Sequence, residues 1–194
     1  MTPQSNAQPK TLEPGLNGLW KLRKSIFENN QVLDQQTAQK SAAQALDYGE
    51  AFLAYDFAAA GLQQGANPRL LQQQALALAR TGSTQRAQSI LQQMRDQGHL
   101  DEETLGILAR TYKDLWLSET DSKNRASFLQ SSLALYREAY ERNRGYWWGI
   151  NVASLSWIAG EHEQARSVAR KIKEELQQNT SPSEDRLWRE ATVA

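Results

Sequence analysis

The sequence predicts an all-α fold, a solenoid built from antiparallel helix pairs. Three observations support this prediction. Apolar residues recur at spacings of three and four, glycine-centred turns interrupt the chain at regular intervals, and small residues recur at constant distances from those turns. No segment shows the two-residue alternation of a half-buried strand. The composition agrees, because good helix formers such as Gln and Ala are abundant and Pro accounts for only 5 of the 194 residues.

The chain opens with a polar segment and then becomes periodic. Residues 1–14 contain three prolines and few apolar side chains, so we expect a disordered lead-in. Residues 15–194 are expected to form one helical array whose last repeat is incomplete, either because it is truncated or because it is a capping helix. The first helix is predicted over residues 16–27 from apolar residues on one face: Leu16, Leu19, Trp20, Leu22, Ile26 and Phe27.

The turns carry the residues that helix ends require. In "GANPRLL", Gly65 suits the left-handed conformation at a helix C-terminus, Asn67 can accept an unpaired amide N–H, and Pro68 lacks the amide that would go unpaired. Asp101 is a similar N-cap. Ser181 with Glu184 three residues later predicts a capping box for a last helix. Further helix breaks are expected at Gly49, Gly82, Gly98 and Gly160.

A repeat emerges when residues are counted from these glycines. Equivalent first-helix positions are Ala38, Leu71, Leu105 and Gly149, at intervals of 33, 34 and 44 residues. Small residues recur at one place in each helix of a pair, where they let two helices approach closely: Ala42, Ala75 and Ala153 in the first helix, and Ala54, Ala87 and Ala165 in the second. The pattern resembles the 34-residue tetratricopeptide repeat, which implies a right-handed α-solenoid. The resemblance is degenerate, because the tryptophan expected early in the first helix is missing.

The unit of 44 residues is longer than its neighbours. The additional residues lie between Tyr112 and Ser132 and correspond to about three extra helical turns shared by two helices. The segment "SETDSKNRA", residues 118–126, should therefore lie at the tip of a projecting hairpin. This tip is either a docking feature for a partner or a tolerated surface insertion, since lengthening a loop costs little.

Two segments resemble a particular family. They are "LGILARTYKDLWL", residues 105–117, and "ALYREAYERNRGYWWGINVASLSWIAG", residues 134–160. The motif positions are Arg110, Lys113 and Asp114; Tyr136, Arg137 and Tyr140; Gly149, Ile150 and Asn151; and Gly160. Over residues 40–194 the chain is similar to the TRAFs-binding domain, the tetratricopeptide-like central regulatory region of apoptosis-signal-regulating kinases, whose bacterial relatives occur beside varied effector modules. The chain departs from those kinases because it carries no kinase or other catalytic domain.

The segment "GYWWGINVASLSWIAG", residues 145–160, holds three tryptophans and a tyrosine. We expect it to be mostly core, with Gly149 permitting a close helix contact. Val152, Ala153 and Ser156 should face the partner helix, while Trp148, Leu155 and Ile158 should pack towards neighbouring repeats. Trp147 and Trp157 fall at repeat positions that line the concave groove, so they are expected at the surface.

A candidate partner-binding groove follows from the register and comprises Arg69, Gln72, Glu103, Arg110, Lys113 and Trp147. Trp147 offers a large, rigid contact area for a peptide anchor. Arg110 and Lys113 could clamp a carboxylate or a phosphate of a partner. The alternative is an internal ion pair of this basic pair with Asp114, Glu103 or Glu138. Because the groove is mixed in charge, it predicts no sharp ligand preference.

Several function classes receive no support from the sequence. The two histidines, His99 and His162, do not occur at spacings typical of metal ligands. The sequence also has no phosphate-binding loop and no nucleophile elbow. We therefore expect no catalytic residue, metal or cofactor. Lys+Arg and Asp+Glu are both 22, which disfavours nucleic acid as a partner. Cysteine is absent, as are a signal peptide and an apolar run of membrane-spanning length, so we expect a cytoplasmic protein without membrane association.

The expected function is therefore a non-enzymatic interaction or scaffold module of a regulatory or signalling protein. Its partner would be a protein or peptide segment, or an effector domain of the same full-length chain. The alternative is a ligand-sensing regulatory domain of a bacterial stress or conflict effector.

Overall fold

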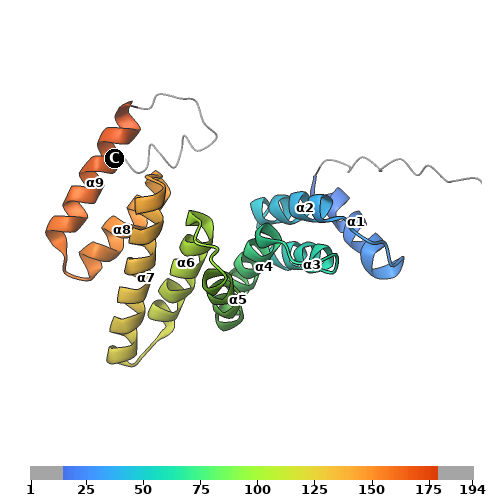
Figure 1. Ribbon diagram of the computed structural model, residues 1–194, viewed down its shortest axis with the longest axis horizontal. Helices are drawn as coiled ribbons and strands as arrows, with labels where there is room; N and C mark the ends of the chain where they lie inside the picture. The colour runs from blue at the N-terminus through green and yellow to red at the C-terminus, as the bar shows by residue number, and fades with distance from the viewer. Residues whose placement is uncertain (1–14, 179–194) are drawn as a thin grey trace, which may run out of the picture. The chain divides into compact units, whose positions relative to one another are not determined.

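The computed structural model describes residues 15–178, and within that range every regular element is an α-helix (Figure 1). The all-α, tetratricopeptide-like class predicted from the sequence is confirmed. The expected lead-in over residues 1–14 and the capping box at Ser181 lie outside the described residues. The helices are α1 (Leu16–Glu28), α2 (Gln35–Asp47), α3 (Ala51–Leu62), α4 (Pro68–Arg80), α5 (Thr84–Asp96), α6 (Glu102–Ser118), α7 (Ser122–Arg142), α8 (Tyr146–Ile158) and α9 (His162–Gln178).

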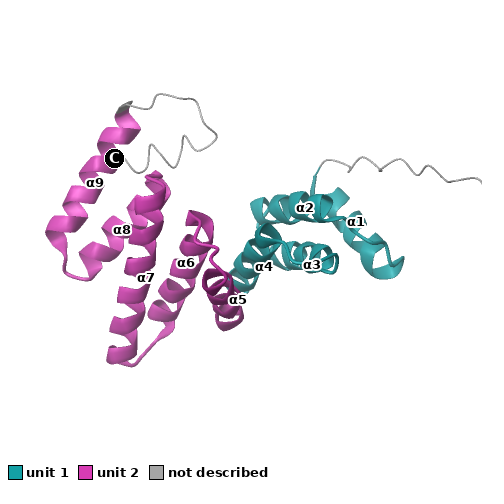
Figure 2. Ribbon diagram, in the orientation of Figure 1, with its two compact units in different colours: residues 1–81 teal, residues 82–194 magenta. Residues whose placement is uncertain are grey.

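The chain divides into two compact units, residues 1–81 and 82–194 (Figure 2). The division falls at Gly82, which the sequence places at the turn of the second helix pair. The first helix of that pair, α4, therefore belongs to unit 1, and its second helix, α5, belongs to unit 2. One continuous array over residues 15–194 stays a prediction.

Unit 1 is built on the hairpin of α2 and α3. The turn contains Gly49 at φ 78°, a conformation that side chains disfavour, and α4 packs against both helices of the pair. Helix α4 begins as predicted, with Pro68 in its first turn and the Leu70 amide donating to Asn67 Oδ1 at 3.2 Å. The approach of α2 and α3 depends on small residues, because a Cβ added to Gly61 would lie 2.5 Å from the Cβ of Ala38.

Helix α1 has a narrower buried face than its sequence suggests. Leu19 is buried, and Leu16, Leu22 and Ile26 pack beside it against the core, but Trp20 and Phe27 are 45% and 55% exposed. The reason is that α1 packs mainly against one helix, α3, which covers only part of its circumference. On the uncovered side, Arg23 lies 4.8 Å from the Phe27 ring and 5.8 Å from the Trp20 ring, and its Nε pairs with Asp56 at 2.5 Å.

Unit 2 consists of α5 to α9, each packed against the next along the chain. The elongated hairpin predicted from the 44-residue interval is present as α6 and α7, of 17 and 21 residues. Aromatic contacts hold its two helices together towards the tip: the rings of Tyr112 and Phe128 are 6.3 Å apart, and Arg125 lies 5.6 Å from the Trp116 ring. The proposed docking role of this tip stays a prediction.

The aromatic segment forms α8, and its packing largely follows the prediction. Gly149 is buried at a close helix contact, since an added Cβ would lie 2.6 Å from Ile172 Cδ1 of α9 and 2.9 Å from Tyr140 Cε2 of α7. Val152, Leu155 and Ser156 are buried. Ile158 was expected to pack towards a neighbouring repeat, which is wrong: it is 51% exposed, because α8 ends there and the chain turns away.

The contact at Gly149 leads to a stability prediction. Gly149→Leu should lower the free energy of unfolding by about 1–3 kcal/mol, because the side chain overpacks the space held by Ile172 and Tyr140. Ser154→Leu, at an exposed position of the same helix, is the matched control and should change stability little. Urea denaturation monitored by circular dichroism measures both.

A double-variant cycle identifies the clashing atom. Ile172→Val removes the Cδ1 atom nearest to the added Cβ, so Gly149→Ala should cost less in the Ile172→Val background than in the wild-type chain. Additive effects of the two substitutions would show that Gly149 does not contact α9 in solution.

Candidate partner-binding surface

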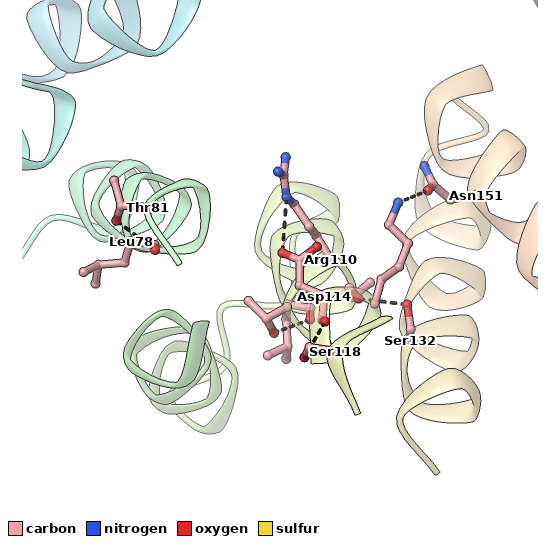
Figure 3. A network of polar contacts seen from close by, with 11 residues as sticks. Leu78, Thr81, Arg110, Asp114, Ser118, Ser132 and Asn151 are labelled. Atoms are coloured by element: carbon pink, nitrogen blue, oxygen red, sulfur yellow. Dashed lines mark hydrogen bonds and ion pairs between the residues drawn. The ribbon is translucent and has the colours of Figure 1, made fainter. Parts of the chain in front are cut away.

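The structure brings three of the predicted groove residues together on neighbouring helices of unit 2. Lys113 on α6 donates from Nζ to Asn151 Oδ1 on α8 at 2.9 Å (Figure 3). Asn151 Nδ2 in turn donates to the Trp147 carbonyl oxygen at 2.9 Å, one helical turn earlier. Arg110 lies one turn before Lys113 on α6. We call Arg110, Lys113, Asp114, Trp147 and Asn151 the α6–α8 surface.

Arg110 is only loosely engaged. Its Nε lies 3.7 Å from Asp114 Oδ2, and both side chains are partly exposed. Exposed ion pairs of this i,i+4 type contribute only about 0.3–0.5 kcal/mol. The terminal guanidinium nitrogens have no partner among the described residues, and Figure 3 shows them pointing away from Asp114. These nitrogens remain available to a carboxylate or phosphate, which the guanidinium can bind in bidentate geometry.

The internal ion pair considered as an alternative exists in part. Asp114 is the acid that pairs with Arg110, whereas Glu138 is occupied by two other arginines. Glu138 receives Arg95 of α5 at 3.4 Å and Arg142 of its own helix at 3.2 Å. Glu138 is thus engaged by arginines of α5 and α7.

Lys113 holds a charge in a partly buried position. Burial lowers the pKa of Lys113, the neighbouring Arg110 lowers it further, and Asp114 opposes both effects. Its Nζ lies 5.7 Å from the Tyr136 ring of α7, close enough for a cation–π contact. Burial also raises the pKa of Tyr136, which is 3% exposed. A partly desolvated cation attracts an incoming anion more strongly than a fully hydrated one does.

Trp147 presents its ring to solvent from the first turn of α8. The residue is 52% exposed, whereas its neighbour Trp148 is turned inwards. The surface position predicted from the register is therefore observed. The residue lies one helical turn before Asn151, to which Lys113 is bonded, so its exposed ring adds an apolar area to the α6–α8 surface.

Gly106 sets the separation of α6 and α8 that Lys113 spans to reach Asn151. This role of Gly106 was not predicted from the sequence. A Cβ added to Gly106 would lie 2.1 Å from Cζ3 of Trp148, so this ring of α8 rests directly on the α6 backbone. The available signal was a glycine in the interior of a helical pattern, which often marks close packing. Asn151 was assigned to the family motif but received no role in the site.

The other predicted groove residues are placed differently. Arg69 and Gln72 lie on α4 in unit 1, where Arg69 Nη1 donates to Gln72 Oε1 at 3.2 Å and Gln72 is buried. Glu103 is half-buried in the first turn of α6. A single groove containing all six residues stays a prediction.

A second hollow lies at the start of α9. It is a shallow depression, largely open to solvent, of about 680 Å³, and it is lined by Arg137, Gly160, Glu161, His162, Glu163 and Gln164. Arg137 is engaged there, because it pairs with Glu161 and donates to Ser156 Oγ at 3.0 Å. Over residues 15–178 no three potential metal ligands cluster, and no helix has the length and apolarity needed to cross a membrane.

Short helix pairs with small residues at their contacts define the tetratricopeptide-repeat class, and the sequence comparison agrees. Residues 47–156, more than half of the chain, match the TPR-S family, Tetratricopeptide Repeats-Sensor. The chain belongs to this family. No curated protein matches the sequence significantly.

Solved structures share the fold at low sequence identity. The thermophilic TPR protein TTC0263 of Thermus thermophilus is 16% identical with a TM-score of 0.65, covering 71% of this chain and 72% of that one. MamA residues 41-end of Desulfovibrio magneticus RS-1 are 14% identical with a TM-score of 0.62, covering 85% and 87%. The human IFIT1 dimer with PPP-AAAA is 16% identical with a TM-score of 0.65, covering 80% of this chain but only 35% of IFIT1. These likenesses establish the fold.

The environment of Lys113 predicts a pH effect on stability. Its native pKa lies below the usual value of 10.5, so the folded chain releases this proton at a lower pH than the unfolded chain does. The wild-type chain should therefore gain stability relative to Lys113→Met as pH rises from the lowered native pKa to 10.5. Tyr136 is present in both chains, so its own titration cancels in the difference.

Chemical denaturation across the alkaline range measures this difference. Lys171→Met, at an exposed lysine of α9, is the matched control and should show no such gain. Parallel stability curves for wild type and Lys113→Met would contradict the partly buried position of Lys113.

Proposed function

We propose that this protein is a non-enzymatic interaction module that binds a segment of a protein partner at the α6–α8 surface. One observation carries the proposal: an exposed tryptophan and an arginine with unengaged terminal nitrogens lie on neighbouring helices. Helix packing holds their backbones, through Trp148 on Gly106 and through Lys113 bonded to Asn151. A preorganised pair of this kind binds without a large ordering cost.

The chemistry fits a peptide that carries both a carboxylate and an apolar side chain. Covering the exposed half of Trp147 would remove roughly 100 Å² of apolar area from water, a gross gain of about 2.5 kcal/mol. Arg110 can add a charge-assisted contact to a carboxylate. Tryptophan and arginine are the residue types that most often dominate interface energetics.

We further propose that the module has a regulatory role in a bacterial, cytoplasmic signalling protein. The resemblance of Arg110, Lys113, Asp114 and the Gly149–Asn151 motif to the TRAFs-binding domain supports this context. The partner is then either a separate protein or an effector domain of the same full-length chain. Membership of the TPR-S family, whose description includes a sensor, is compatible with such regulation.

A second candidate is the binding of a small anionic ligand. Two cations on α6 and an exposed indole on α8 would suit a phosphate attached to a planar ring, and IFIT1 was solved with PPP-AAAA. The peptide proposal is favoured because the Lys113 ammonium is already bonded to Asn151 and Asp114 lies beside Arg110. A carboxylate there repels a multiply charged phosphate more than it repels a single carboxylate.

The proposal is tested with a random peptide library selected on the immobilised chain. Selected peptides should combine an acidic residue with an aromatic or aliphatic one. Trp147→Ala or Arg110→Ala should weaken their binding by roughly tenfold or more, while the melting temperature stays within a few degrees, because both side chains are largely outside the core.

Matched controls separate site effects from general surface effects. Trp20→Ala and Arg86→Ala remove an exposed tryptophan and an exposed arginine elsewhere and should leave affinity unchanged. Peptide binding that survives both site substitutions would refute the proposal. Saturable stabilisation by ATP that Arg110→Ala abolishes, without peptide enrichment, would establish the small-ligand candidate instead.

A further inference from the structure

The helix pair α8–α9, the last in the described residues, exposes repeat positions that are buried in the earlier pair α2–α3. Trp157, near the end of α8, is 50% exposed. Its ring is tilted against the His162 ring with centroids 4.4 Å apart, and the Arg166 guanidinium lies 5.6 Å away. Ala169, Arg170 and Lys173 follow Arg166 at helical spacings on the same flank of α9, and all three are exposed. We call Trp157, Arg166, Ala169, Arg170 and Lys173 the end face.

The repeat register shows what this face lacks. Trp157 lies three residues before the turn glycine Gly160, and Ala169 lies nine residues after it. The equivalent residues around Gly49 are Leu46 and Ala58, which are 9% and 0% exposed. The same repeat positions are thus buried in the pair α2–α3 and exposed in the pair α8–α9.

The difference has a visible cause in unit 1. Helix α4 packs against both α2 and α3, and a Cβ added to Gly61 of α3 would lie 2.8 Å from Leu70 Cδ1 of α4. No helix among residues 15–178 follows α9 to take the corresponding place. The end face is therefore shaped for a following helix, and leaving Trp157 and Ala169 in water forfeits the burial that such a helix provides.

The charge of the end face restricts what can cover it. Arg166, Arg170 and Lys173 form a basic row along α9, which Glu163 and Glu174 flank at one helical turn. A complementary segment needs apolar side chains for Trp157 and Ala169 and carboxylates for the basic row.

We propose that residues 181–192 of this chain cover the end face. The segment "SPSEDRLWREAT" carries the apolar pair Leu187 and Trp188, and its three acids, Glu184, Asp185 and Glu190, outnumber its two bases, Arg186 and Arg189, by one. The segment begins three residues after Gln178, the last described residue of α9, so it is adjacent to the end face in sequence. The position in sequence, the apolar pair and the net negative charge therefore suit docking of this segment.

Hydrogen exchange measured by mass spectrometry tests the contact from both sides. Residues 181–192 should be protected in the wild-type chain, and Ala169→Asp or Leu187→Asp should speed their exchange roughly tenfold or more. Ser167→Asp, at an exposed position of α9 outside the end face, is the matched control and should leave protection intact. Unprotected residues 181–192 in the wild-type chain, or equal effects of Ala169→Asp and Ser167→Asp, would overturn the proposal.

Disulfide trapping identifies the occupant, because the chain contains no cysteine of its own. The double variant Ala169→Cys with Leu187→Cys should form an intramolecular disulfide, seen as a monomer of changed mobility without reductant. Ser167→Cys with Leu187→Cys should react more slowly. Disulfide-linked dimers from the first pair would show that a second copy covers the face, and equal rates for both pairs would show an undirected tail; either result overturns the proposal.

Discussion

Close helix contact at two glycines is the constraint on which unit 2 depends. Gly149 lets α8 approach α7 and α9 so closely that a single Cβ would overlap Ile172 and Tyr140. Gly106 accepts the ring of Trp148 and so sets the separation of α6 and α8. A larger residue at Gly106 would displace the Trp148 ring and with it the helix spacing across which Lys113 reaches Asn151. The glycines thus position the candidate surface without contributing a functional group to it.

The same contacts explain why adjacent tryptophans differ in role. Successive residues of a helix point about 100° apart, so α8 cannot present Trp147 and Trp148 to one environment. With Trp148 resting on Gly106, the ring of Trp147 is left 52% exposed. Trp147 is therefore exposed because Trp148 packs against α6, and its exposed ring is available for binding.

The electrostatic arrangement of the α6–α8 surface preserves positive charge. Lys113 is bonded to the neutral amide of Asn151, which satisfies the ammonium without cancelling its charge. Asp114 approaches Arg110 at 3.7 Å, beyond hydrogen-bond distance, and leaves the terminal nitrogens unengaged. Burial disfavours the charged form of Lys113 and so lowers its pKa, which Asp114 opposes only in part.

The sequence by itself determined the helices, their caps and the repeat register. Asn67, Pro68 and Asp101 act locally, since each affects amide groups within one turn, and the spacing of Gly49, Gly82 and Gly160 reflects a repeated local structure. The close contact of Gly149 was also predicted, because a glycine inside an otherwise apolar helix suits a place where another helix passes closely. Only the tertiary structure decided that Trp148 seats on Gly106, that Lys113 bonds to Asn151 and that Ile158 remains exposed. These outcomes depend on distances between helices far apart in sequence, which side-chain volumes on several helices set jointly and a periodic pattern does not record.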